Sequence, residues 1–162
     1  MHLLTICGSL QDGSANAALL GRFAGAMDAD DVATPAVSPG DIPHFRPDLP
    51  DVDPAVHQFR SQIAAADAVL IATPEYAHSL PGSLKNALDW IVGSGELYEK
   101  PVAIVAAANG ASRGGLGRGA LEQTLRAQGS LIVDTRTVTP ESTSDAVTEV
   151  LRLLRAATAA PA

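Results

Sequence analysis

Cysteine and positive charge are both scarce in this chain of 162 residues. The single cysteine, Cys7, has no partner for an internal disulfide and cannot form a CxxC metal site, so we expect a reducing compartment and no bound metal. Eleven Lys and Arg residues stand against 18 Asp and Glu, which gives a formal net charge of -7. This balance argues against non-specific binding of nucleic acid or of an anionic membrane surface.

Long apolar runs are also missing. No stretch is apolar for long enough to span a bilayer, and no basic segment followed by an apolar one has the form of a secretory signal. We therefore expect a soluble cytoplasmic protein. The length predicts one domain over residues 1–162, and a content of 46% hydrophobic residues is enough for a substantial core.

Short apolar runs, by contrast, recur along the chain. They occupy residues 3–7, 68–72, 102–107 and 131–133, and each is continuous rather than alternating. Continuous runs of this length are typical of strands that are buried on both faces of a sheet. A further, weaker strand is predicted over residues 31–37, although it contains Pro35.

Helical periodicity separates the apolar runs. Pro81 is placed near the start of the third helix, Gly129 just past the fourth, and Thr139 and Pro140 as cap and first residue of the fifth. Each stripe would pack one helix face on a sheet. The stripes consist of Leu19, Phe23 and Met27; Leu84, Leu88 and Ile91; Leu121 and Leu125; and Val147, Val150, Leu151 and Leu154.

Strands that alternate with helices predict an α/β protein with a doubly wound, five-stranded parallel sheet and helices on both faces. We expect the strand order 2-1-3-4-5 of flavodoxin-like proteins. Residues 38–53 carry four prolines and are predicted to form an extended surface loop rather than a helix. These prolines are Pro39, Pro43, Pro47 and Pro50.

The loop after the first strand carries small polar residues and leads into a helix. In an open parallel sheet, ligands bind at the carboxyl ends of the strands, where a helix N-terminus offers unpaired N–H groups to an anion. Ser14 follows Gly13 directly, so the lysine of a nucleoside-triphosphate loop is missing and a monophosphate is favoured. Alternatively, Ser14 only caps the helix. The candidate phosphate ligands are Ser9, Gln11, Ser14, Ala15 and Asn16.

The loop after the third strand begins Thr73-Pro74-Glu75-Tyr76. Together with the Gly-Ser-x-x-x-x-Ser-x-Asn pattern of the first loop, it resembles the NADPH-dependent FMN reductase family of flavodoxin-like proteins. The resemblance covers nearly the whole chain, and it is most specific in these two loops and in residues 84–90. It implies bound FMN, with NADPH or NADH as hydride donor.

In this family the Pro-Glu-Tyr segment runs alongside the isoalloxazine ring and provides main-chain contacts, which the resemblance assigns to Pro74, Glu75, Tyr76, Ala77 and His78. The family usually has Asn where this chain has Ala77, so one polar side-chain contact is absent. Tyr76 is interpreted as a wall of the ring site or as an ordinary loop aromatic. His78 is either a proton donor or a solvated loop residue.

A glycine-rich loop follows the fourth strand. In the family it covers the far edge of the ring, which adds Asn109, Gly110, Ser112 and Gly114 to the candidate cofactor ligands. Gly115-x-Gly117-x-x-Ala120, with Asp134 further along, also matches a dinucleotide-binding fingerprint. We reject that interpretation, because seven residues separate the strand end from the first glycine and no second nucleotide-binding half follows.

The resemblance predicts an FMN-dependent oxidoreductase that passes hydride from NAD(P)H through the flavin to a quinone, azo compound, free flavin or oxyanion. No catalytic side chain is required, because the flavin carries the chemistry. Asn86, Asp89 and Trp90 would serve packing or subunit contact in a homodimer or homotetramer. The family commonly has arginine at the position of Gln11. Two alternatives remain: a non-enzymatic FMN electron carrier, and a flavin-free regulatory or interaction domain of the same fold.

Overall fold

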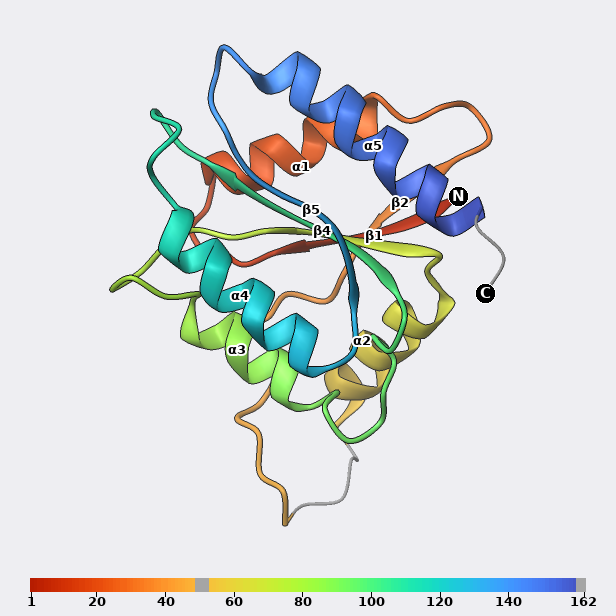
Figure 1. Cartoon of the computed structure of the whole chain (residues 1–162). Helices are drawn as coiled ribbons and strands as arrows, with labels where there is room; N and C mark the ends of the chain where they lie inside the picture. The colour runs from red at the N-terminus through yellow and green to blue at the C-terminus, as the bar shows by residue number, and fades with distance from the viewer. Residues whose placement is uncertain (49–52, 160–162) are drawn as a thin grey trace.

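The computed structural model describes residues 1–48 and 53–159 as five strands that alternate with five helices. The strands are β1 (His2–Cys7), β2 (Val32–Pro35), β3 (Ala68–Ala72), β4 (Pro101–Ala107) and β5 (Leu131–Val138). The helices are α1 (Ala15–Gly25), α2 (Pro54–Ala65), α3 (Gly82–Asp89), α4 (Gly115–Ala127) and α5 (Thr143–Ala159). Figure 1 shows them along the chain.

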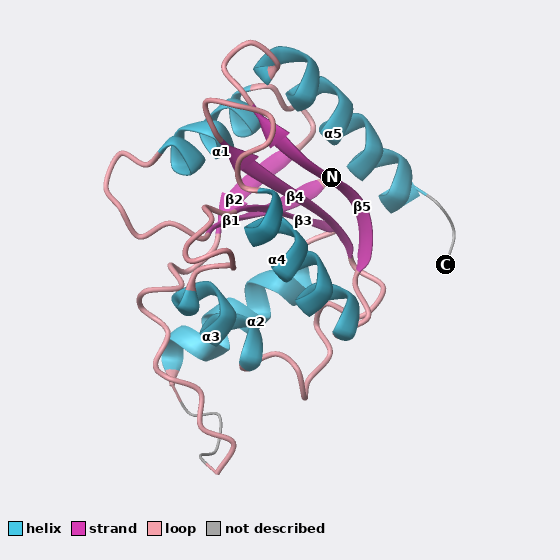
Figure 2. Cartoon of the chain, turned by 60° about the vertical axis from the view of Figure 1, so that its left-hand side comes forward, coloured by secondary structure: helices cyan, strands magenta, loops and turns pink. Residues whose placement is uncertain are grey.

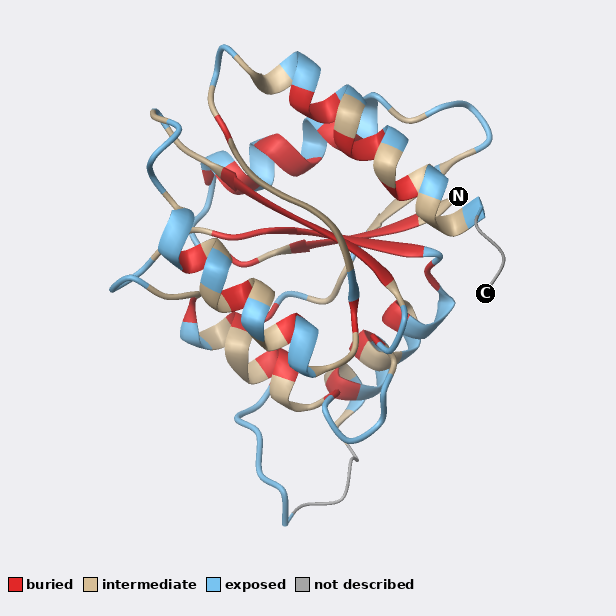
Figure 3. Ribbon diagram, in the orientation of Figure 1, coloured by how far each residue is buried: buried red, intermediate tan, exposed pale blue. Residues whose placement is uncertain are grey.

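All strand pairs are parallel, and the sheet order is β2-β1-β3-β4-β5. The predicted fold is therefore confirmed. Helices α1 and α5 cover one face of the sheet, and α2, α3 and α4 cover the other (Figure 2). Because both faces are covered, β3 is buried over its whole length (Figure 3), as its continuous apolar sequence predicts.

Two apolar layers make up the core. Phe23 of α1 packs with Val150 and Leu154 of α5 on one side of the sheet. On the opposite side, Phe59 of α2 and Leu88 of α3 pack in the second layer. All five side chains are fully buried. The core therefore fixes the strands, while the loops at their carboxyl ends stay open to solvent.

Two predicted boundaries differ from the structure by three residues or more. Helix α5 begins at Thr143, three residues after Pro140, because Thr139 and Ser142 first form a turn in which the Thr139 N–H donates to Ser142 Oγ. Strand β5 continues to Val138 instead of ending at residue 133. As an edge strand it is only half-buried, so its second half can be polar and does not show the continuous apolar run that predicts a buried strand.

The proline-rich segment forms a loop and no helix where it is described, as predicted, and it contains turns at residues 39–40 and 47–48, while Pro50 lies outside the described residues. Its buried residues in the described part are Pro39 and Ile42. Asn86 of α3 holds it by donating to Pro43 O at 2.9 Å and accepting from Phe45 N at 2.7 Å. Trp90 Nε1 also donates to Pro43 O. Asn86 and Trp90 therefore pack within the subunit.

Over the described ranges, no helix is both long and apolar enough to cross a membrane.

Candidate functional site

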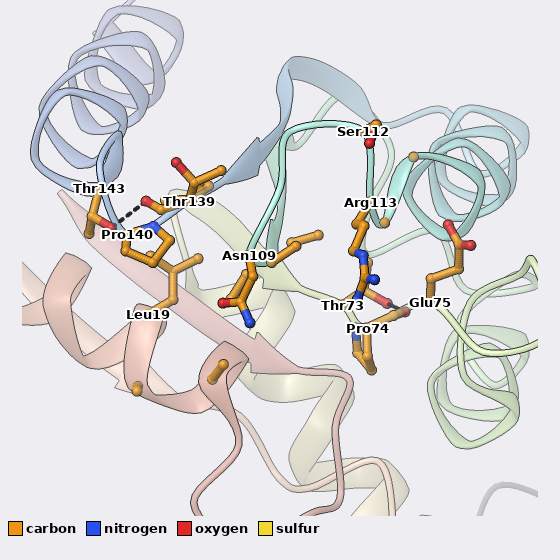
Figure 4. Close-up of a pocket in the computed structure, with 18 of the residues that line it drawn as sticks. Leu19, Thr73, Pro74, Glu75, Asn109, Ser112, Arg113, Thr139, Pro140 and Thr143 are labelled. Atoms are coloured by element: carbon orange, nitrogen blue, oxygen red, sulfur yellow. Dashed lines mark hydrogen bonds between the residues drawn. The ribbon is translucent and has the colours of Figure 1, made fainter.

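A cleft of about 1000 Å³ opens at the carboxyl edge of the sheet (Figure 4). One wall is α1, and the others are the loops that follow β3, β4 and β5. This is the edge at which ligands bind in doubly wound sheets. Half of the predicted site residues line it: Ala15, Pro74, Glu75, His78, Asn109, Ser112 and Gly114. The other half lie outside its lining: Ser9, Gln11, Ser14, Asn16, Tyr76, Ala77 and Gly110.

The first loop is held by its own hydrogen bonds. Ser14 is the N-cap of α1, and its Oγ accepts from Ala17 N at 3.1 Å. Its N–H donates to Gln11 O, and Gln11 N donates to Ser9 Oγ. The capping role that the sequence left open is thus present. The cap does not use the Ser14 hydroxyl proton, since a hydroxyl accepts through its lone pairs and donates separately, and the same oxygen lies 3.9 Å from Cys7 Sγ.

Asn16 links the same loop to the centre of the sheet. It is 5% exposed, and its Oδ1 accepts from Ala107 N at the end of β4 at a distance of 3.0 Å. The backbone N–H groups of Ala15 and Asn16 have no acceptor within the described part of the chain. No acidic residue lies in the first turn of α1. The positive end of this helix is therefore free to receive an anion.

The loop after β3 forms a tight turn that borders the cleft. Tyr76 and Ser79 exchange two backbone hydrogen bonds of 3.0 Å each. Between them, Ala77 and His78 adopt left-handed conformations with φ of 49° and 62°. Asparagine adopts this conformation at lower cost than alanine. Ala77 therefore carries backbone strain that the family's usual Asn would relieve, in addition to the missing polar contact.

Glu75 fastens this turn to α4. Its Oε2 accepts from Leu116 N at 2.9 Å and from Gly117 N at 3.0 Å, two of the unpaired N–H groups at the start of that helix. The bond from Gly117 N is the main reason that the pKa of the Glu75 carboxyl lies below its ordinary value, and His78 contributes to the same shift. His78 Nδ1 lies 3.4 Å from the carboxylate, but the side chain is 81% exposed. Glu75 thus positions the turn and leaves His78 in solvent.

Close packing explains one glycine of α4, Gly117. A Cβ on Gly117 would lie 3.0 Å from both Cα and Cβ of Glu75 and 3.1 Å from Ser79 O. Asp134, the acidic residue of the fingerprint, forms an ion pair with Arg136 on β5 and does not line the cleft. The glycine therefore permits contact between α4 and the turn, and no dinucleotide motif is needed to account for it.

Some lining residues were missed by the sequence analysis. Ala18, Leu19 and Arg22 line the cleft beside the predicted Ala15 on one face of α1, and the i, i+3, i+4 and i+7 spacing of the four residues is the signal that identifies them. Arg113 comes from the loop after β4, and Figure 4 shows its side chain extending toward Thr73 and Pro74. The loop after β5 adds Thr139 and Pro140, and the first residue of α5 adds Thr143.

The fold is that of a flavodoxin-like protein, and the candidate site is the cleft at the carboxyl edge of its sheet. Oxidised flavodoxin 1 of Bacillus cereus superimposes with a TM-score of 0.69 at 14% identity, covering 96% of this chain and 98% of that one. A structure of FerB, a flavoenzyme NAD(P)H:(acceptor) oxidoreductase from Paracoccus denitrificans, gives a TM-score of 0.83 at 26% identity and covers 95% of both chains.

Sequence comparison assigns the family. The model of the NADPH-dependent FMN reductase family matches residues 1–145, and the chain belongs to this family. An NAD(P)H-dependent FMN reductase of Pseudomonas aeruginosa is 40% identical over 114 residues, which are 68% of this chain and 61% of that relative. A probable NADPH:quinone oxidoreductase of Oryza sativa subsp. japonica is 36% identical over 136 residues, 80% of this chain and 66% of that relative. The chain thus spans less than two thirds of the length of either relative.

Substitution of Gly117 and Gly119 by alanine should have opposite effects. Gly117→Ala should destabilise the protein, because its Cβ meets the backbone of the Glu75 turn. Gly119→Ala is the matched control on the same helix, with nothing within 4 Å of the added Cβ, and it should stabilise by about 0.5–1 kcal/mol. Urea denaturation of both variants tests this, and equal effects of the two substitutions would contradict the packing role of Gly117.

The contacts of Glu75 predict a stability contribution that depends on pH. Because the pKa of the folded state is lowered, the contribution is complete above the unfolded value of about 4.3 and is lost as pH falls through the lower folded value. The difference in free energy of unfolding between the wild type and Glu75→Gln should stay constant above about pH 5 and shrink below about pH 4. His78→Ala should retain this dependence, since the contacts with α4 remain. If the difference in free energy of unfolding between the wild type and Glu75→Gln increases at acid pH, the stabilising role of the ionised Glu75 carboxylate is contradicted.

Proposed function

We propose that this chain is a flavin-dependent oxidoreductase that binds FMN at the carboxyl edge of the sheet and passes electrons from NAD(P)H to a small acceptor such as a quinone. The observation that carries the proposal is the cleft itself, in which the Glu75 turn and the free N-terminus of α1 border one space. Family membership and the activities for which the reductase relatives are named support it.

The residues present fit the cofactor. A phosphate group would accept hydrogen bonds from the N–H groups of Ala15 and Asn16, assisted by the hydroxyls of Ser9 and Ser14 and the amide of Gln11. The ring would lie against the turn at Pro74–His78 and the loop that contains Asn109, Gly110, Ser112 and Gly114. FMN, when bound, supplies the redox chemistry by accepting a hydride.

The chain's own contribution is orientation. Glu75 holds the turn against α4, and Asn16 holds the start of α1 against β4, so both walls of the cleft stay fixed relative to the sheet. Fixed walls lower the cost of placing a donor and an acceptor in turn against one ring face. No side-chain acid or base is assigned, because His78 is exposed and paired with Glu75.

The same proposal includes a single domain over residues 1–162 and a cytoplasmic location, which the single cysteine supports. It also includes a homodimer or homotetramer with the site at a subunit boundary. Three apolar side chains around the carboxyl edge are more than half exposed and favour such a contact: Leu10, Tyr76 and Leu116.

Two measurements test the proposed function. Added FMN should shift its absorbance spectrum and lose fluorescence on binding to the purified protein, and the loaded protein should then oxidise NADPH or NADH in steady state with a quinone as acceptor. Binding of FMN without oxidation of NAD(P)H would identify an electron carrier instead. Absence of FMN binding would favour a flavin-free domain.

Replacement of Gln11 by arginine should tighten the binding of FMN. Gln11 is exposed and lies in the phosphate loop, where the candidate ligands are all neutral. A guanidinium would add one charge-assisted contact of about 1.5–3 kcal/mol, or roughly a tenfold to hundredfold lower dissociation constant. The affinity for riboflavin, which has no phosphate, should not change.

The control for this prediction is Asp12→Asn, which changes the charge of the same loop by the same amount without adding a guanidinium. Fluorescence titrations of FMN and riboflavin should separate the three proteins. If FMN and riboflavin tighten equally in Gln11→Arg, or if Asp12→Asn tightens FMN as strongly, position 11 does not contact the phosphate.

A further inference from the structure

Unpaired positive charge is concentrated in the cleft. Most of the eleven Lys and Arg residues form ion pairs with Asp or Glu. Lys100 donates instead to the carbonyls of Ala64 and Ala66, and Arg118 donates to Thr135. Within residues 1–48 and 53–159, Arg22 and Arg113 are the two cations whose side chains have no partner. Both line the same cleft.

The two arginines reach the cleft from different elements. Arg22 lies in the last turn of α1, and Arg113 lies in the loop between β4 and α4. Asn109 and Ser112 of the same loop also line the cleft, and their side chains have no hydrogen-bond partner within the described part of the chain. Each of these four side chains can donate hydrogen bonds, and both arginines can do so in pairs to a carboxylate or phosphate.

Negative charge in the cleft is already engaged. Glu75 is the only carboxylate that lines it within the described residues. One of its oxygens accepts from two N–H groups of α4, and the carboxylate is paired with His78. The protein has a net charge of -7, but in this cleft two unpaired cations face a single carboxylate that already has hydrogen-bond partners. The local charge therefore favours binding of an anion.

We propose that Arg22 and Arg113 form a subsite for the oxyanion of the ligand that exchanges electrons with the flavin: a phosphate of the nicotinamide nucleotide or a carboxylate of the acceptor. The proposal rests on the proposed function. The flavin's own phosphate is assigned to the first loop, of which only Ala15 lines the cleft. A volume of about 1000 Å³ lies at the upper end of the range for small-molecule sites, so a second ligand has room there.

The test measures ligand binding by calorimetry on the FMN-loaded protein, with redox-inert probes in place of the reacting compounds. NADP⁺ and NAD⁺ differ only in the 2′-phosphate, and 4-hydroxybenzoate and phenol differ only in the carboxylate. The variants are Arg22→Gln and Arg113→Gln, both at exposed positions. The matched control is Arg152→Gln, an exposed arginine of α5 that is paired with Glu149.

We expect each cleft variant to raise the dissociation constant of NADP⁺ or of 4-hydroxybenzoate about tenfold or more. The dissociation constants of phenol and FMN should not change in these variants. The Arg152→Gln protein should bind every ligand as the wild type does. An effect on NADP⁺ alone identifies the 2′-phosphate as the anion, and an equal effect on NAD⁺ identifies the diphosphate. An effect on 4-hydroxybenzoate identifies an acceptor carboxylate.

Three results would overturn the subsite: the wild type binds neither anion, the cleft variants bind both anions as the control does, or the variants weaken FMN itself. The last would assign the two arginines to the flavin phosphate. Failure of the proposed function is read separately, from the FMN titration of the wild type. If that titration shows no binding, the same anion titrations are carried out on the flavin-free protein and still decide whether Arg22 and Arg113 bind an oxyanion.

Discussion

The parallel sheet with both faces covered is the constraint on which the remaining structure depends. Because the strands run in one direction, their carboxyl ends meet at one edge. Because helices cover both faces, the central strands β3 and β4 carry no polar side chains. Chemistry is therefore confined to the loops at that edge. Their placement relies on a few contacts across long sequence distances. Asn16 binds the end of β4, and Glu75 binds the start of α4.

The contact of Glu75 with α4 shows how one carboxylate can serve two elements. The first N–H groups of α4 need acceptors, and Gly114, with φ of 76° and no side chain, cannot supply a cap. Glu75 supplies it from another loop. The turn is then held at residues Ala77 and His78, whose left-handed backbone would otherwise be costly. The glycine at 117 is the geometric condition for this approach, since any larger residue would push the two elements apart.

Much of the fold could be predicted because the strands β3 and β4 are continuous apolar runs, a pattern that burial on both faces produces directly. Where burial is partial, the prediction was less accurate. The polar half of β5, from Asp134 to Thr137, lies at the sheet edge, and the turn before α5 depends on Ser142 and Thr143 rather than on Pro140. In the first loop, the pattern included helix capping by Ser14 as an alternative, and the structure shows this cap, but the pattern did not indicate the partner of Asn16. Ala107 is 91 positions away from Asn16, and nothing in the local sequence indicates it.

Arg22 and Arg113 illustrate why charge at a site is harder to predict than fold. Their residue types are evident from the sequence, but whether a cation is paired depends on which acids the fold brings near it. At ionic strengths of the cell, fields decay over about 8 Å, so the overall charge of -7 says little about the potential inside a cleft. Local pairing decides it. A chain can be acidic as a whole and still attract an anion at its site if most of its cations are paired elsewhere and two unpaired ones line the same cleft. This attraction should weaken as salt is added.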